Sequence, residues 1–129
     1  MDIKTSERTE LIDITDRVRK EIIESGIKNG ICLISTRHTT SCIIINENER
    51  GLRNDIMDML EALVPGEKNY AHDQIDNNAD AHLRAVLLGM SEVIPIEDGH
   101  PLLGTWQSIF FVELDGPRNR SINIKIIEG

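Results

Sequence analysis

Apolar residues recur along the chain with two different periods, and each period predicts a type of element. Ile14, Val18 and Ile22 are spaced four residues apart, which predicts an amphipathic helix. The same helical spacing returns over 52–63, where a Pro-Gly pair ends it, and over 78–88, where a glycine follows as a C-cap. The pattern therefore predicts three helices separated by non-helical segments.

Other apolar segments have the composition and alternation of β-strands. Ile122, Ile124 and Ile126 fall on one face of the clearest of them. Strands outnumber helices and follow one another at each end of the chain, which favours a mainly antiparallel sheet or pair of sheets with helices packed on one side. We therefore predict an α+β fold in a single domain over 1–129, with strands over 3–12, 30–36, 41–46, 92–96, 105–114 and 120–127.

Composition and charge argue against nucleic acids and membranes as binding partners. The formal net charge is −8 and only four residues are Phe, Trp or Tyr, so the chain lacks the positive surface and stacking side chains of a nucleic-acid-binding protein. No apolar run is long enough for a bilayer and no signal peptide is recognisable, which predicts a cytoplasmic protein without a membrane partner. Cys32 and Cys42 lie in apolar strand segments and are expected to be buried thiols.

Polar residues gather in three stretches where strands or helices are predicted to end. The first holds His38, Thr39 and Thr40, followed after the next strand by Asn46 and Glu47. A histidine suits general acid/base chemistry near neutral pH, and threonine hydroxyls suit a bound phosphate. Glu47 could be a base or a ligand. The alternative is a polar hairpin turn, with Glu47 as the capping carboxylate of the next helix.

The second stretch combines metal-ligand residues with a predicted helix start. His72, Asp76 and His82 are the imidazole and carboxylate ligands that Zn²⁺ and similar ions accept. Asn78 and His82 are four residues apart and so project from one face of the helix, whose N-terminal N–H groups attract anions. Asp76 could instead cap the helix while His82 is an ordinary half-buried histidine, and the spacing alone leaves both interpretations open.

The third stretch contains Gln107 and Arg118. Arg118 follows a Gly-Pro turn, and its guanidinium suits two-point recognition of phosphate or carboxylate. A turn arginine paired with Asp115 is an equally ordinary interpretation. Gln107 could donate an amide hydrogen bond to a ligand.

Taken together, these stretches resemble the YjbQ-like family, also called the secondary thiamine-phosphate synthase family, over essentially the whole chain. Each stretch is weak alone, but their order and separations are specific. The matching residues are His38-Thr39-Thr40-Ser41 with Asn46-Glu47, then His72, then 76–83, then 103–107, and finally 113–118 with Arg120.

The resemblance implies a compact sandwich that assembles as a homotrimer, with the shared polar residues in clefts between subunits. It also implies a divalent metal ion, Zn²⁺ or Mg²⁺, near the histidines. The activity it implies is a weak thiamine-phosphate synthase, a transferase that couples a pyrimidine pyrophosphate to a thiazole phosphate. Phosphorylated small molecules are then the expected partners.

Two alternatives from other classes are a metal-dependent phosphate-ester hydrolase and a non-enzymatic trimeric protein that binds a metal or small molecule. Under the leading hypothesis the residues divide into three roles. They are His38 and Glu47 for catalysis; Thr39, Thr40, Asn46, Asn78, Gln107 and Arg118 for substrate binding; and His72, Asp76 and His82 for the metal.

Overall fold

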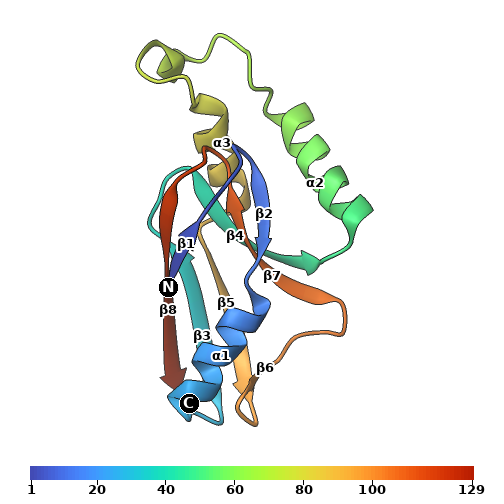
Figure 1. Ribbon diagram of the computed structural model, residues 1–129, viewed down its shortest axis with the longest axis vertical. Coiled ribbons are helices and arrows are strands. Elements are labelled where there is room, and N and C mark those ends of the chain that lie inside the picture. The colour runs from blue at the N-terminus through green and yellow to red at the C-terminus, as the bar shows by residue number, and fades with distance from the viewer.

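Two antiparallel sheets form the framework of the structure, a computed structural model that describes residues 1–129 (Figure 1). The larger sheet has five strands in the order β1 (Asp2–Lys4), β8 (Asn119–Glu128), β3 (Gly30–Thr36), β5 (Ser91–Glu97) and β6 (His100–Pro101). The smaller sheet has three strands in the order β2 (Glu10–Asp13), β7 (Gln107–Glu113) and β4 (Ser41–Glu47).

Helix α1 (Thr15–Ser25) closes the space between the two sheets. Its buried residues Val18 and Ile22 join one apolar cluster with side chains from both sheets, among them Ile34 of β3 and Phe111 of β7. The start of the helix is tied to the smaller sheet, because the Thr15 hydroxyl donates to Asp13 at 2.6 Å and accepts from the backbone N–H of Ile109 at 2.8 Å. The apolar face predicted for this helix is therefore its buried face.

The smaller sheet buries both of its faces. Ile109 and Phe111 of β7 point into the first cluster, while Phe110 and Val112 point into a second one on the opposite face. Residues of α2 (Arg50–Leu63) and α3 (Ala79–Leu88) cover that second face. A strand covered on both sides needs apolar residues at every position, which explains why β7 has a continuous apolar run.

Charged side chains tie the helices to the rest of the chain. Glu49, rather than Glu47, caps α2 by accepting hydrogen bonds from its first N–H groups. Asp80 of α3 is 2% exposed, accepts two hydrogen bonds of 3.1 Å from Arg8, and lies 3.5 Å from Arg84. Arg84 in turn donates to the carbonyl of Val64 at the end of α2. The segment from α2 to α3, which includes the short 3-10 helix η1 (Ala71–Gln74), arches away from the sheets in Figure 1.

The predicted α+β fold, with antiparallel sheets and helices in one domain, is confirmed. Several element boundaries differ by one or two residues, and larger differences occur at the start of the chain and before β7. The predicted strand over 3–12 is two strands in different sheets, with 5–9 between them; β6 and η1 were not predicted; and β7 starts at Gln107 rather than Thr105. None of the helices combines the length and apolar character needed to cross a lipid bilayer.

Both cysteines are free and buried, as predicted. Burial raises the pKa of Cys32 to about 11 and that of Cys42 to about 12. Both thiols are therefore protonated near neutral pH, and a protonated thiol is a poor nucleophile and metal ligand.

The turn between β7 and β8 depends on a glycine. A Cβ atom on Gly116 would lie 2.4 Å from the carbonyl oxygen of Glu7 and 2.8 Å from the hydroxyl of Thr5. Gly116→Ala should therefore lower the free energy of unfolding by about 1–3 kcal/mol, measured by urea denaturation. Gly66→Ala is the control, because its Cβ would meet only Asp80, at 3.6 Å. Equal stability of the two variants would contradict this packing.

Candidate functional site

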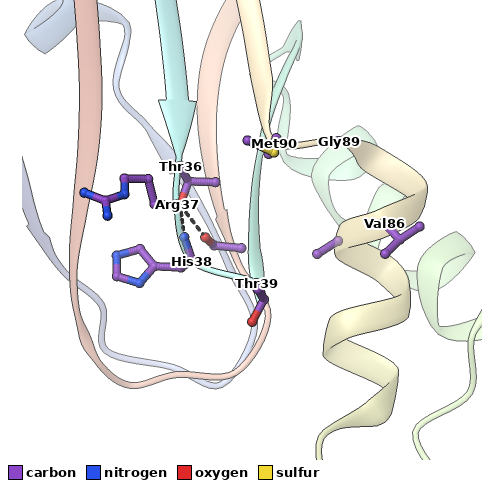
Figure 2. A pocket seen from close by; sticks show the side chains of 9 residues that line it. Thr36, Arg37, His38, Thr39, Val86, Gly89 and Met90 are labelled. Carbon is purple, nitrogen blue, oxygen red and sulfur yellow. Dashed lines mark hydrogen bonds between the residues drawn. The ribbon is translucent and has the colours of Figure 1, made fainter.

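Three segments that are distant in the sequence meet at one end of the sheets and enclose a polar pocket. They are the turn between β3 and β4, which Figure 2 shows from close by, the start of α3, and the turn between β7 and β8. The pocket has a volume of about 430 Å³ and no hydrophobic residue in its lining. It is lined by Arg37, His38, Thr39, Thr40, Asp76, Asn78, His82, Asp115, Arg118 and Arg120.

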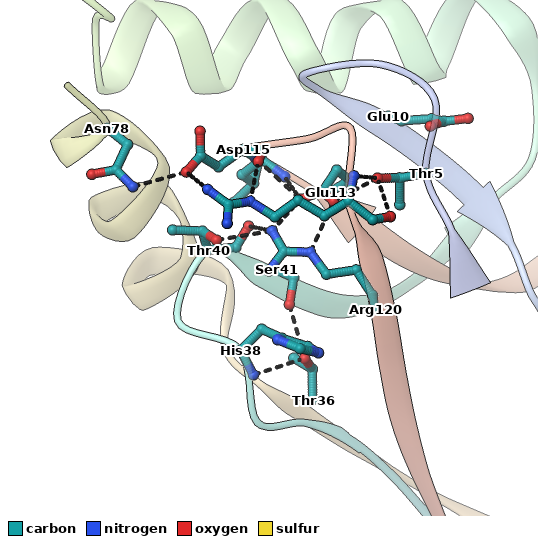
Figure 3. Close-up of polar contacts among 12 residues, drawn as sticks. Thr5, Glu10, Thr36, His38, Thr40, Ser41, Asn78, Glu113, Asp115 and Arg120 are labelled. Atoms are coloured by element: carbon teal, nitrogen blue, oxygen red, sulfur yellow. Dashed lines mark hydrogen bonds and ion pairs between the residues drawn. The ribbon is translucent and has the colours of Figure 1, made fainter. Parts of the chain in front are cut away.

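A buried ion pair lies beneath this pocket. Arg120 donates to Glu113 from two of its nitrogens, one of them Nε at 2.8 Å, and the Thr5 hydroxyl donates to the same carboxylate at 2.7 Å (Figure 3). Glu113 is 0% exposed and Arg120 is 6% exposed. Burial by itself would raise the pKa of Glu113, but the hydrogen bonds from Arg120 and Thr5 outweigh it and hold that pKa below its ordinary value.

The same pair fixes the two turns that border the pocket. Arg120 donates to the Thr40 hydroxyl at 2.9 Å, and Glu113 accepts from the backbone N–H groups of Leu114 and Asp115 at 3.0 and 3.1 Å. The Leu114 N–H also donates to the Thr40 carbonyl at 3.1 Å. The positions of the turns are therefore set by charge-assisted hydrogen bonds rather than by loop sequence alone.

His38 is neutral, and only one of its ring nitrogens is free. Its Nε2 accepts a hydrogen bond of 3.1 Å from the backbone N–H of Ser121. An acceptor nitrogen carries no proton, so the proton of the neutral ring is on Nδ1. Burial, followed by the nearby charge of Arg120, lowers the pKa of His38. Because its lone pair is already engaged, His38 can offer a ligand an N–H donor but not a general base.

A chain of hydrogen bonds connects the helix start to the β7–β8 turn. Asn78 donates to Asp115 at 2.8 Å, so its amide oxygen accepts from Nε2–H of His72 at 2.9 Å. Asp115 also accepts from Arg118 at 2.9 Å. At the helix itself, the N–H of Ala79 donates to the Asp73 side chain at 3.0 Å. Part of the predicted anion-binding helix end is therefore occupied by a carboxylate of the chain itself.

The side chains around the predicted divalent-ion site do not form a complete set of metal ligands. His72 and His82 are in contact, with ring centroids 4.8 Å apart, but no group of three or more His, Cys, Asp or Glu side chains could hold a metal ion. Nε2 of His72 also carries a proton, which excludes it as a ligand atom in this arrangement. The residues present do not fit the ion, and the metal roles of His72, Asp76 and His82 stay predictions.

The structure divides the other predicted site residues into two groups. His38, Thr39, Thr40, Asn78 and Arg118 line the pocket together with the predicted metal ligands Asp76 and His82. The second group, Asn46, Glu47 and Gln107, lies at the opposite end of the smaller sheet, where Glu47 pairs with Gln107 while Ser41 pairs with Glu113. A seven-residue strand separates the two ends by about 20 Å, so these three do not reach the pocket within one chain.

Arg37, Asp115 and Arg120 line the pocket but were not assigned to it from the sequence. A signal for one of them was present. Glu113 ends an apolar strand, where a charged residue is rarely buried without a partner. Such a carboxylate calls for a cation as partner, and the sequence offers Arg118 and Arg120 shortly after it.

The fold and the pocket define an α+β domain with a polar site at one end of its sheets. The chain belongs to the family described as UPF0047 protein YjbQ-like, whose model matches residues 1–129. The resemblance read from the motifs is confirmed at this level.

Relatives and solved structures agree with this assignment. A UPF0047 protein of Methanothermobacter thermautotrophicus is 57% identical, with 96% of this chain and 87% of the relative covered. The UPF0047 protein YugU of Bacillus subtilis is 38% identical, with 98% of this chain and 96% of the relative covered. A crystal structure from Sulfolobus solfataricus, described as a YbjQ-like protein of unknown function, has a TM-score of 0.98 and 45% identity, covering 100% of this chain and 94% of that one.

These comparisons correct the predicted function. The expectation of a thiamine-phosphate synthase was wrong. Neither the family description nor the descriptions of these relatives mention thiamine synthesis, and the Sulfolobus protein is described as of unknown function. The name secondary thiamine-phosphate synthase is likewise not supported for the family.

The ion pair beneath the pocket should make stability depend on pH. The pKa of Glu113 is lowered by folding, so its contribution is complete above the ordinary carboxyl pKa of 4.5 and is lost as the pH falls below it. Glu113→Gln should lower the free energy of unfolding at pH 7 by about 3–5 kcal/mol, because Arg120 is left buried without a counter-charge. Urea denaturation from pH 7 to pH 3 should show a weaker pH dependence in this variant than in the unaltered protein.

Glu61→Gln, at an exposed position of α2, is the control and should change neither the stability nor its pH dependence. If Glu113→Gln kept the full pH dependence, the acid sensitivity would have to come from other carboxylates.

Proposed function

We propose that the polar pocket binds the phosphate group of a phosphorylated small molecule. The observation that carries this proposal is the free guanidinium of Arg37. Arg118 and Arg120 are paired with Asp115 and Glu113, whereas the exposed Arg37 side chain lines the pocket and has no hydrogen bond in Figure 2. A guanidinium fork matches phosphate oxygens at two points, which a bound phosphate would use.

The charge of the lining supports an anionic ligand. The lining contributes three guanidinium groups and two carboxylates, in a chain whose net charge is −8. Arg118 is half-exposed and adds a second cation within the pocket. With Arg118 and Arg120 paired to Asp115 and Glu113, Arg37 is the cation of the lining that remains available to an anionic ligand.

His38 fits the same role. With the proton on Nδ1, it would donate a neutral hydrogen bond to a phosphate oxygen, while Nε2 remains held by the Ser121 N–H. Thr39 is exposed in the same turn and would offer a hydroxyl. The proposal concerns binding, because the arrangement of Arg37, His38 and Thr39 offers donors to a phosphate group.

Inorganic phosphate is the simplest probe of this proposal. Isothermal titration at pH 7.5 should detect binding to the unaltered protein. Arg37→Gln should weaken it about tenfold, because a charge-assisted hydrogen bond contributes roughly 1.5–3 kcal/mol before solvent screening. Arg50→Gln, an exposed arginine at the start of α2, is the matched control and should bind as the unaltered protein does. Equal affinities in the two variants, or no binding at all, would refute the proposal.

We also propose that copies of the chain associate as a homotrimer. Support comes from the outer face of the larger sheet, where Ile31, Val93 and Ile127 are exposed on the adjacent strands β3, β5 and β8. Contiguous exposed apolar side chains on one face are typical of an interaction surface. Association would also give Glu47 and Gln107 of one copy a way to approach the pocket of another.

Light scattering tests this second proposal independently of phosphate. The mass should be three times the 14.5 kDa of the chain at micromolar concentration. Val93→Lys should lower that mass, because a lysine on this face would be buried in the interface without a partner. Ile23→Lys, at an exposed position of α1, is the control. A mass of 14.5 kDa for the unaltered protein would contradict the trimer.

A further inference from the structure

A second cavity adjoins the polar pocket, and its chemistry is different. It lies between the β3–β4 turn and the C-terminal half of α3, and its volume is about 300 Å³ (Figure 2). The helix side of the cavity is formed by Ala85, Val86, Gly89 and Met90. This volume is at the lower end of the range that small-molecule sites occupy.

The helix side of this cavity presents only apolar side chains. Val86 is 81% exposed and Met90 is 59% exposed, so both leave hydrocarbon surface in water. Neither side chain can donate or accept a conventional hydrogen bond. A hydroxyl group placed against them would lose its bonds to water without replacement, whereas a hydrocarbon group would gain from leaving water.

The two cavities share one border. Arg37, His38 and Thr39 line both of them. Figure 2 shows α3, with Val86, on one side of the turn, while the Arg37 and His38 side chains extend from the other side. Thr39 stands at the end of the turn between these two sides, so a ligand that uses both cavities passes over Thr39.

We infer that the ligand is a phosphate monoester of a short hydrocarbon group. Its phosphate occupies the polar pocket and its hydrocarbon group occupies the cavity against Val86 and Met90. This inference rests on the proposed phosphate site and adds the class of group to which the phosphate is attached. Thr36 and Ser41 also line this cavity, but their hydroxyls are hydrogen-bonded to each other at 2.8 Å. The inferred group is hydrocarbon rather than polyol, because the helix side offers contact area and no hydrogen-bonding side chain.

Three probes separate the contributions of the two cavities: inorganic phosphate, butyl phosphate and glycerol 3-phosphate. The two esters are similar in length, but only the butyl group is apolar. Isothermal titration of the unaltered protein should give butyl phosphate an affinity about tenfold higher than that of glycerol 3-phosphate, since burying two or three methylene groups suffices for such a ratio. Inorganic phosphate should bind more weakly than butyl phosphate.

A matched pair of variants on α3 locates the hydrocarbon group. Val86→Asn should weaken butyl phosphate about fivefold and leave inorganic phosphate unchanged. Leu87→Asn is the control, because Leu87 is the next residue, is 56% exposed and does not line the cavity. Met90→Gln is a second cavity variant in case Val86→Asn fails to fold, which circular dichroism would reveal.

The outcomes distinguish this inference from the proposed function. Equal affinity for butyl phosphate and glycerol 3-phosphate would overturn the hydrocarbon specificity and leave the phosphate site standing. Equal losses in Val86→Asn and Leu87→Asn would show that the butyl group does not occupy this cavity. If inorganic phosphate and both esters fail to bind, the proposed function fails together with the inference.

Discussion

The buried contact between Glu113 and Arg120 is the interaction on which the arrangement of the site depends. It joins the end of β7 to the start of β8, and through Thr40 and Thr5 it reaches the β3–β4 turn and the segment after β1. A charged pair in an apolar interior is weak support for stability, because desolvation offsets most of the attraction. Its effect here is on position, since its hydrogen bonds determine where the two turns can lie.

The periodicity of apolar residues was sufficient to predict most of the fold. The three helices and the strands around Cys32 and Cys42 appear where the spacing places them, because each buries one continuous apolar face or run. The prediction of a single strand over 3–12 was wrong because the two halves of this segment belong to different sheets. Residues 5–9 carry no apolar side chain, and the chain uses them to pass from the larger sheet to the smaller one.

The site was predictable in part. His38, Asn78 and Arg118 were identified because polar residues cluster where strands and helices end, and those ends meet in the folded chain. Spacing could not show that the lone pair of His38 faces the Ser121 N–H, or that Asp73 rather than a ligand takes the first N–H of α3. Such partners are set by tertiary contacts. The separation of Glu47 and Gln107 from His38 likewise depends on strand direction and register, which the sequence pattern leaves open.

The bidentate contact between Arg8 and Asp80, together with the contacts of Arg84, has a consequence for ligand affinity. Asp80 lies two residues after Asn78, so the helix start is anchored to the N-terminal segment and to the end of α2. With Glu113 and Arg120 anchoring the opposite side, the walls of the pocket are preorganised before any ligand arrives. Arg118 is already held by Asp115, so binding has to immobilise little more than the side chain of Arg37, at an entropic cost of about 0.5–1.5 kcal/mol.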